Sequence, residues 1–373
     1  MTVQLTIADL HELAAARLPR AAYDYYASGA EDEHTLAENE AGWARVRLRP
    51  RCLVDVSTRD LSTTVLGKHV SMPVLVAPTA FQRMAHPDGE LATARAASAA
   101  ATVMVLSTLA TTTLEDVAAA YDAKRRDAGG RWFQLYVYRD RGVTRALVER
   151  AEAAGYDALV LTVDTPYLGR RLRDVRNGFA LPQGLSVANL VGHGKGALGE
   201  AAGESGLAAY VTAMLDPSLT WRDVEWLRSI TRLPVVIKGV LRDDDARLAA
   251  SHGASAVVVS NHGGRQLDGA ISTAAALPEV VDAVGDALEV YVDGGVRRGS
   301  DVLRALALGA RAVLVGRPVL WGLACDGEPG VATALEMLRA ELDLSMALAG
   351  CVSASGVARD GLVHPVESAR RGP

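Results

Sequence analysis

The stretch VVVSNHGGRQLDG, residues 257–269, joins a run of β-branched apolar residues to a polar segment that is rich in glycine. An apolar run without alternating polar residues is typical of a parallel strand that is buried on both faces. The run stops shortly before His262 and Arg265, which two glycines separate. The fold therefore has to bury this strand and leave a basic, proton-accepting segment at its carboxyl end.

Similar runs recur along the chain, and amphipathic helical patterns separate them. The apolar runs are Met72–Pro78, Val103–Thr108, Trp132–Val137, Ala158–Asp164, Pro234–Gly239, Ala256–Asn261, Glu289–Gly294 and Arg311–Gly316. The helical patterns are Gly89–Ala101, Leu114–Lys124, Val143–Ala154, Trp221–Thr231, Asp243–Ser251, Thr273–Val284 and Ser300–Leu308. This alternation predicts an α/β protein with a (β/α)8 barrel, the TIM-barrel fold. An open, doubly wound sheet is the alternative, but no Gly-x-Gly-x-x-Gly follows the first strand.

The pattern predicts one domain over residues 1–373. Residues 1–70 form an N-terminal helical extension of two or three short helices, 71–325 form the barrel, and 326–373 form C-terminal helices and a tail. The connection after the fourth strand, residues 166–217, is unusually long, and a loop of this length is typically a lid or a disordered segment. Its Gly/Ala/Ser-rich part is not expected to pack firmly, and we expect part of Gly184–Ala208 to be mobile or to cover the pocket as a lid.

Composition excludes several classes of function. The formal net charge is −5, and no basic stripe with interleaved aromatic residues indicates nucleic-acid binding. The three cysteines, Cys52, Cys325 and Cys351, are widely spaced, which argues against a disulfide framework or a zinc site and favours a reducing cytoplasm. No window of eighteen apolar residues predicts a membrane span, and the N-terminus lacks a secretion signal. We expect a cytoplasmic protein without a metal.

The carboxyl ends of the predicted strands carry mostly polar residues. In a (β/α)8 barrel these ends face one shared pocket. The residues at or just after them are Pro78, Thr79, Ala80, Ser107, Gln134, Tyr136, Thr162, Asp164, Lys238, Ser260, His262, Arg265, Asp293, Gly316 and Arg317. Each has a structural explanation by itself, for example as a local cap, but their convergence indicates a functional site.

His262 and Arg265 combine a base with a guanidinium that can bind a carboxylate. Gly263 and Gly264 would let the backbone turn and approach a ligand closely. The pair suits a substrate whose acid group lies next to the reacting carbon, and the alternative is a capped histidine beside a surface arginine. Lys238 could form a Schiff base, pair with an acid or stabilise an anionic ring, and its position leaves all three open.

The seventh and eighth strand ends predict a phosphate site, because barrels commonly bind phosphate there with loop amides and a helix N-terminus. The glycines are Gly294, Gly295 and Gly316, and Arg297 and Arg317 add positive charge. Sugar phosphates, nucleotides and FMN would all fit such a site.

The chain resembles the FMN-dependent 2-hydroxy-acid oxidase family, which includes glycolate oxidase, lactate oxidase and mandelate dehydrogenase. The resemblance runs from YDYYASGAEDEHTLAEN near the start to MALAGC near the end. Its motifs are APTAFQRMAHPDGE, QLYVYRDR, LTVDTPYLGRRLRDVRNGF, IKGV, SNHGGRQLDG, VDGGVRRGSDVLRALALGA and VGRP.

The resemblance implies a role for each matching residue. His262 would be the base that takes a proton from the substrate, and Asp164 would stabilise its charged form. Arg265 and Arg171 would bind the substrate carboxylate together with Tyr25. A further group would contact the substrate oxygen or the FMN ring, ribityl chain and phosphate. Its members are Tyr136 for the substrate oxygen, and Pro78, Thr79, Ala80, Ser107, Gln134, Thr162, Lys238, Ser260, Asp293, Gly294, Gly295, Arg297, Gly316 and Arg317 for FMN.

The resemblance also implies the reaction: oxidation of an (S)-2-hydroxy acid to the 2-oxo acid, with O2 as acceptor and H2O2 as product. Leu109 stands where glycolate oxidases typically carry tryptophan, so Leu109 and Phe81 would leave room for a substrate larger than glycolate. A dehydrogenase or monooxygenase outcome, an FMN-bound isomerase, a Schiff-base aldolase and a non-catalytic barrel remain alternatives. Family members are commonly tetramers, so we expect a homo-oligomer.

Overall fold

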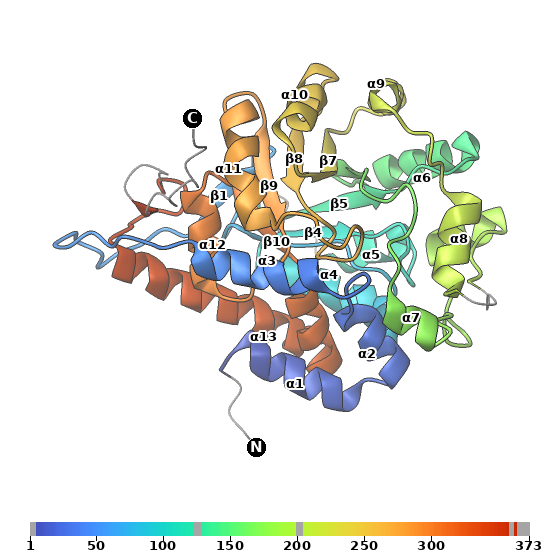
Figure 1. Cartoon of the computed structure of the whole chain (residues 1–373), viewed down its shortest axis with the longest axis horizontal. Helices are drawn as coiled ribbons and strands as arrows, with labels where there is room; N and C mark the ends of the chain where they lie inside the picture. The colour runs from blue at the N-terminus through green and yellow to red at the C-terminus, as the bar shows by residue number, and fades with distance from the viewer. Residues whose placement is uncertain (1–4, 122–127, 199–203, 358–361, 364–373) are drawn as a thin grey trace, which may run out of the picture.

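The computed structural model describes residues 5–121, 128–198, 204–357 and 362–363. Eight parallel strands close into a barrel in the order β10-β3-β4-β5-β6-β7-β8-β9 (Figure 1). The strands are β3 (Val74–Val76), β4 (Val103–Leu106), β5 (Gly130–Leu135), β6 (Ala158–Thr162), β7 (Val235–Val240), β8 (Ala256–Val259), β9 (Glu289–Asp293) and β10 (Ala312–Val315). The predicted (β/α)8 barrel is confirmed, and the open sheet is excluded because β10 pairs with β3.

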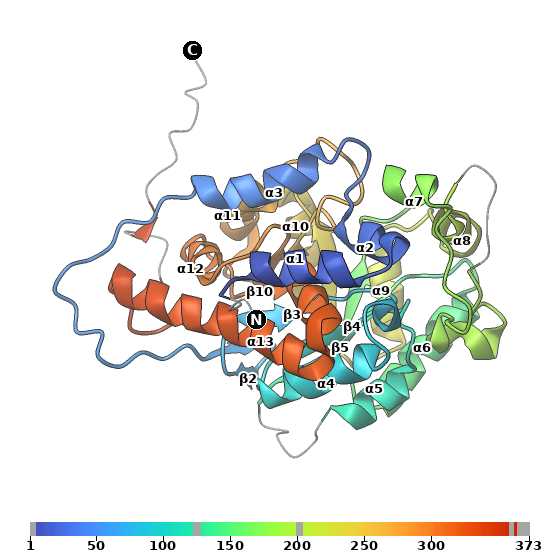
Figure 2. The ribbon, with the colours of Figure 1, turned by 90° about the horizontal axis from the view of Figure 1, so that it is seen from below.

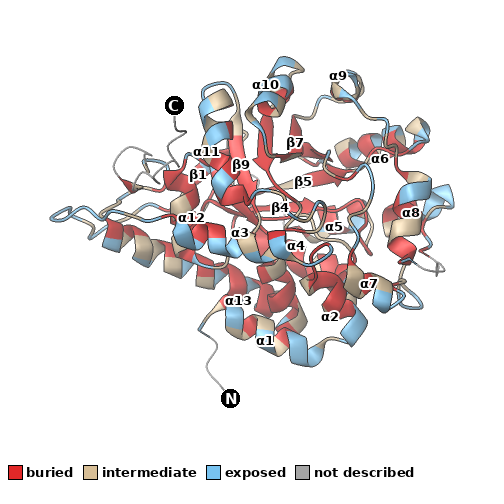
Figure 3. Ribbon diagram, in the orientation of Figure 1, coloured by how far each residue is buried: buried red, intermediate tan, exposed pale blue. Residues whose placement is uncertain are grey.

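The barrel has two apolar cores, because successive residues of a strand point to opposite faces. The inner core fills the barrel with alternate strand residues such as Val103, Val105, Val258 and Leu314. The residues between them, for example Val257, pack outward against the helices. Both faces of each strand are buried (Figure 3). This explains why the strands appear in the sequence as continuous apolar runs.

Helices surround the barrel on its outside (Figure 1). They are α4 (Gly89–Ala99), α5 (Leu114–Ala120), α6 (Arg141–Ala153), α9 (Trp221–Ser229), α10 (Asp243–Ser251), α11 (Thr273–Val284), α12 (Gly299–Ala307) and α13 (Arg317–Ala349). The helices from α4 to α12 in this list correspond to the seven predicted patterns, although the predicted end of the helix at 114–124 lies partly outside the described residues. α13 begins before the predicted boundary at 325 and breaks at Asp326 and Gly327, whose backbone angles are not helical.

The predicted N-terminal helices are α1 (Ile7–Arg17), α2 (Arg20–Ala27) and α3 (His34–Arg45). α1 packs along α13, and α3 lies against α11 and α12 (Figure 2). A short antiparallel hairpin of β1 (Thr63–Val65) and β2 (Lys68–Val70), which the sequence analysis missed, precedes the barrel. Its Val65 and Val70 belong to the inner core, so the hairpin closes the amino-terminal end of the barrel.

The long connection after β6 contains α7 (Leu172–Arg176), the 3-10 helix η3 (Ala188–His193) and α8 (Gly206–Met214). The expectation that its Gly/Ala/Ser-rich part does not pack firmly is wrong for α8. Leu207, Tyr210 and Val211 share one face of this helix and are buried, and the Ser205 side chain accepts a hydrogen bond from the backbone N–H of Ala208. Among the described residues, no helix combines the length and apolarity that a membrane crossing requires.

Candidate active site

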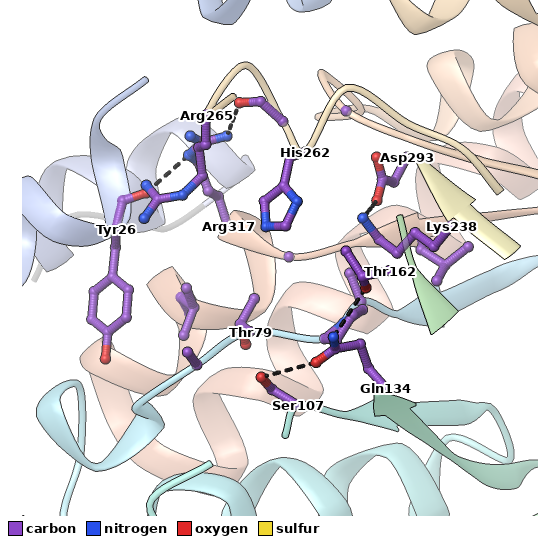
Figure 4. A pocket seen from close by; sticks show the side chains of 18 of the residues that line it. Tyr26, Thr79, Ser107, Gln134, Thr162, Lys238, His262, Arg265, Asp293 and Arg317 are labelled. Atoms are coloured by element: carbon purple, nitrogen blue, oxygen red, sulfur yellow. Dashed lines mark hydrogen bonds and ion pairs between the residues drawn. The ribbon is translucent and has the colours of Figure 1, made fainter. Parts of the chain in front are cut away.

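A cavity opens at the carboxyl ends of the barrel strands (Figure 4). It holds about 1080 Å3 of space free of protein atoms, the open mouth included. The sequence-predicted residues that line it are Tyr25, Pro78, Thr79, Ala80, Ser107, Leu109, Gln134, Tyr136, Thr162, Arg171, Lys238, His262, Arg265, Asp293, Gly294, Gly295, Arg297, Gly316 and Arg317.

The cavity floor continues the inner face of the barrel by the two-residue strand period. Ser107 follows Val105 of the inner core by two positions, and Ser260 follows Val258 in the same way. Thr79, Gln134, Thr162, Lys238, Asp293 and Gly316 stand in the same relation to inner-core residues of their own strands. The alternation that packs the barrel therefore also turns these polar groups inward.

His262 and Asp164 form a pair at the cavity wall. His262 Nδ1 lies 2.9 Å from Asp164 Oδ1. Burial alone raises the pKa of Asp164, but its contacts with His262 and Lys238 outweigh burial and lower that pKa. An ionised carboxylate only accepts hydrogen bonds, so Nδ1 donates and the neutral imidazole keeps its lone pair on Nε2. Burial lowers the pKa of His262 although Asp164 opposes it, which keeps the imidazole neutral and able to accept a proton.

Two guanidinium groups face the same cavity. Arg265 lies over the ring of Tyr25 at 4.9 Å from its centroid, and Arg265 Nη1 donates to the backbone carbonyls of Tyr25 at 2.6 Å and Ser28 at 2.8 Å. Arg171 is 4 % exposed, and its Nε has no hydrogen-bond partner. Burial, followed by repulsion from Arg265, lowers the pKa of Arg171 to about 10. A buried cation with a free donor beside a half-buried one makes an anion site.

Lys238 is held as a buried cation. Its Nζ lies 3.0 Å from Asp293 Oδ2 and donates to Ser260 Oγ at 2.9 Å. Burial lowers the pKa of Lys238, but Asp293 and Asp164 outweigh burial, and the pKa rises. A charged ammonium has no lone pair for attack on a carbonyl. Among the three possibilities that the sequence left open, this geometry favours the acid pair and the stabilisation of an anionic ring over a Schiff base.

Neutral polar side chains lie beside Lys238, beginning with Thr162 on the neighbouring strand (Figure 4). Gln134 Nε2 donates to Thr162 Oγ1 at 3.0 Å, and Gln134 Oε1 accepts from Ser107 Oγ at 3.3 Å. Thr79 Oγ1 accepts from Gln82 Nε2 at 3.0 Å. Burial raises the pKa of Tyr136, followed by the nearby charge of Asp164, so its phenol stays protonated and able to donate. These groups can hydrogen-bond the edge of a planar, polar ring.

The far end of the cavity is positively charged. Arg317 donates to the backbone carbonyls of Tyr26, Gly263 and Ser28, and Arg297 Nη2 lies 2.9 Å from Glu40 Oε1. Burial lowers the pKa of both guanidiniums. Gly316 caps the N-terminus of α13, where backbone N–H groups favour anions.

Three predicted residues lie behind the cavity wall. Asp164 contacts His262, and Ser260 accepts a hydrogen bond from Lys238. Phe81 was expected to line the substrate region, but its side chain is fully buried, with its ring 5.5 Å from the ring of Tyr25. Gly264 was expected to allow close approach to a ligand. Instead it allows close approach to α3, because a Cβ there would lie 2.6 Å from the backbone nitrogen of Leu36.

The sequence analysis missed several lining residues, chiefly Tyr26, Thr165, Leu168, Leu207 and Val211. Leu207 and Val211 belong to α8, which places this part of the predicted lid segment at the cavity wall. Their four-residue spacing on an apolar helix face was a signal that could have identified them.

Comparison with known proteins identifies the family. A model of the FMN-dependent dehydrogenase family matches residues 14–364. The chain belongs to this family. The L-lactate oxidase of Nostoc sp. is 56% identical over 347 residues, which are 93% of this chain and 94% of the relative. Glycolate oxidase 3 of Arabidopsis thaliana is 54% identical over 353 residues, 95% of this chain and 94% of the relative.

A solved structure of a mandelate oxidase with (S)-4-hydroxymandelic acid superimposes with a TM-score of 0.90 at 46% identity. It covers 95% of this chain and 98% of its own. The expectation of an FMN-dependent family member is confirmed.

The cavity fits the FMN cofactor of the family. Asp293 Oδ1 is buried without a hydrogen-bond partner, which suits a hydroxyl of a ribityl chain. The charge of Lys238 suits a ring that becomes anionic on reduction. Arg297 and Arg317 would hold the phosphate beside the N-terminus of α13. At Gly295 a Cβ would lie 2.2 Å from the backbone oxygen of Asn39, so only glycine fits at this position of the loop after β9.

Proposed function

We propose that this protein oxidises an (S)-2-hydroxy acid to the corresponding 2-oxo acid and passes the electrons to O2, which yields H2O2. The observation that carries the proposal is the His262–Asp164 pair in the same cavity as Arg171 and Arg265. A neutral base beside a carboxylate-binding pair suits a substrate with a hydroxyl next to its acid group. The lactate and glycolate oxidases among the relatives support the same reaction class.

The residues divide the work in the following way. Arg171, Arg265 and Tyr25 bind the carboxylate, and this binding fixes C2 and its hydroxyl relative to His262 and Tyr136. His262 Nε2 accepts the proton that the substrate loses, and Asp164 stabilises the resulting imidazolium. Tyr136 donates a hydrogen bond to the substrate oxygen. Oxidation of the alcohol releases two protons and two electrons, and bound FMN would supply the acceptor of both electrons and of the second proton.

A substrate panel with peroxide detection tests the proposal. Glycolate, lactate, mandelate and long-chain 2-hydroxy acids would be oxidised in the presence of O2, with oxo acid and peroxide measured together. One peroxide per oxo acid is the expected result. A decarboxylated acid without peroxide would indicate a monooxygenase, and turnover that needs a dye in place of O2 would indicate a dehydrogenase. No turnover of any 2-hydroxy acid would refute the proposal.

Replacing Leu109 with tryptophan is expected to shift the preference from bulky 2-hydroxy acids towards glycolate. Leu109 lines the cavity with Leu168, Leu207 and Val211, and a tryptophan would fill the apolar space between them. The ratio of kcat/KM for glycolate to that for mandelate measures the effect, and Leu248→Trp, at an exposed position on α10, is the control. An unchanged ratio would mean that Leu109 does not limit substrate size.

The acid side of the pH profile is expected to lie below the ordinary histidine pKa of 6.5, because burial lowers the pKa of His262. The neutral imidazole is the active form, so kcat/KM should stay level until the pH falls through this lowered pKa. In Asp164→Asn the limb should move to still lower pH, since Asp164 raises the pKa of His262, and the rate should also fall. A wild-type limb above 6.5 would contradict the assignment of His262 as the base.

We further propose that the chain acts as one unit in a cytoplasmic homotetramer. The three cysteines are free, which suits a reducing compartment. Exposed apolar side chains at Leu344, Leu348 and Val352 suit contact with another copy. Light scattering of the purified protein measures the number of subunits.

A further inference from the structure

We propose that Asn39 on α3 is a positioning residue for the base of the reaction. Through a reciprocal amide pair with Asn261 it holds the next residue, His262, in the backbone conformation that turns the imidazole into the cavity. The inference depends on the role proposed above for His262. It assigns a function in the reaction to a helix that lies outside the barrel.

The two amides satisfy each other. Asn39 Nδ2 donates to Asn261 Oδ1 at 2.8 Å, and Asn261 Nδ2 donates to Asn39 Oδ1 at 2.8 Å. Both side chains are buried, with 1 % and 4 % exposure. Asn261 Oδ1 also accepts from the backbone N–H of Gly264 at 3.1 Å, and Asn261 Nδ2 donates to the carbonyl of Ile271 at 3.1 Å. The Asn261 side chain is therefore hydrogen-bonded to two residues that follow His262 in the same loop, Gly264 and Ile271.

His262 needs such support because its φ is +59°, in the left-handed region. A residue with a Cβ is strained there, and the conformation persists where the surroundings impose it. The Ser260 hydroxyl accepts from the His262 backbone N–H at 3.0 Å, and Asp164 fixes the ring through Nδ1. These two contacts hold the backbone nitrogen and the imidazole of His262. The amide pair holds Asn261, the residue that precedes His262.

α3 has little freedom to absorb a change at Asn39. Trp43 Nε1 on this helix donates to the carbonyl of Gly294 at 2.8 Å. The helix backbone also approaches Gly264 and Gly295 so closely that a Cβ on either residue would overlap Leu36 or Asn39. The helix is thus fixed against the loops after β8 and β9. If the Asn39 amide is lost, we therefore expect the Asn261 side chain to move and the helix to stay in place.

Arg265 lies in the same segment but has separate anchors on the carbonyls of Tyr25 and Ser28. The carboxylate-binding pair should therefore stay in place when the amide pair is broken. This separation predicts a fall in kcat with little change in KM, which a general loss of structure would not produce.

The experiment compares Asn39→Leu and Asn39→Asp with Glu38→Gln in FMN-loaded enzyme. Glu38 lies on the same helix with 43% of its side chain exposed. With turnover expressed per bound FMN, kcat of Asn39→Leu is expected to fall by about 10- to 100-fold, the scale of a small misplacement of a reacting group. Glu38→Gln should match the wild type. The pKa of His262, followed by NMR of the labelled imidazole, should fall in Asn39→Leu as its contact with Asp164 loosens.

Asn39→Asp adds a pH test. An ionised carboxylate cannot donate to Asn261 Oδ1, whereas a protonated one can, so the ratio of variant to wild-type activity should rise as the pH falls. The ionisable groups of α3 and of the elements packed against it are His34, Glu38, Glu40 and Arg45 on α3, His262, Arg265 and Asp268 after β8, Glu279 and Asp282 on α11, Arg297 and Arg298 after β9, and Asp301 and Arg304 on α12. These groups are common to both proteins, so the ratio removes their contribution except for a shift in the pKa of His262, and Asn39→Leu measures that part. Asn39→Leu should show only the smaller rise that follows from the lowered pKa of His262, because no group at position 39 titrates.

Wild-type kcat per bound FMN in Asn39→Leu, or a variant-to-wild-type ratio for Asn39→Asp that stays flat with pH, would overturn the inference. A loss of activity per mole of protein that only matches the loss of bound FMN would do the same, because it would show a purely structural role. If His262→Ala kept full activity, the proposed function of His262 would fail first. If His262→Ala were inactive while Asn39→Leu was unaffected, the positioning role alone would fail.

Discussion

Replacing His262 with alanine is expected to lower kcat for the 2-hydroxy acid by about 10²- to 10⁴-fold, the usual contribution of a general base. The imidazole is the neutral group in the cavity that combines a free lone pair with a carboxylate to stabilise its charged form. FMN should stay bound, because the contacts that fit the cofactor come from other strand ends. Stopped-flow reduction of the bound flavin and its visible absorbance measure the two quantities separately.

His252→Ala provides a matched control for this experiment. His252 also pairs with a carboxylate, since its Nδ1 lies 2.8 Å from Glu225 Oε1, but the pair lies outside the cavity. Its removal should leave kcat unchanged. A His262→Ala enzyme that reduces flavin at the wild-type rate would show that another group accepts the proton.

Replacing Lys238 with methionine is expected to cost the FMN-free protein about 3–5 kcal/mol in free energy of unfolding, because a buried pair loses one partner. Lys238 and Asp293 have side-chain exposures of 5% and 9%, so the carboxylate of Asp293 would stay buried without its cation. The affinity for FMN should also fall, since the charge that suits the reduced ring disappears. Urea unfolding of FMN-free protein and fluorescence titration with FMN measure the two effects.

The double variant Lys238→Met/Asp293→Asn should recover much of the lost stability but not the FMN affinity, because it removes the unpaired charge without restoring the cation. Lys68→Met is the control. Its ion pair with Asp157 is 3.4 Å long with side-chain exposures of 44% and 24%, and exposed pairs contribute about 0–1 kcal/mol. If Lys238→Met and Lys68→Met lost the same free energy of unfolding, the buried pair would contribute no more to stability than the exposed one.

The fold and the cavity floor followed from local patterns. The apolar runs correspond to the strands. The residue two positions beyond the last inner-core residue of a strand, such as Lys238 or Asp293, points into the cavity. Strand alternation is a property of neighbouring residues, so a linear reading can follow it. The assignment of roles to Arg171 and Tyr25, which lie outside the strands, came from family resemblance and not from any such pattern.

The sequence analysis was least complete on contacts between distant segments. Phe81 packs behind Tyr25 and Gly264 approaches α3, while α8, from the segment expected to form a lid, places Leu207 and Val211 at the cavity wall. Each outcome depends on how a helix or loop outside the barrel is docked onto it. The spacing of Leu207 and Val211 indicates that one helix face is buried, but it does not indicate which part of the barrel that face packs against.

The sequence by itself determined that eight buried parallel strands close around an apolar core and present polar groups at one end. Two-sided burial and a two-residue period leave few other arrangements for these runs. The tertiary structure alone decided that Asp164 meets His262 across ninety-eight positions, and that Asn39 meets Asn261 across more than two hundred. Such pairs depend on the geometry of packed helices and closed strands, which brings together side chains that no local pattern connects.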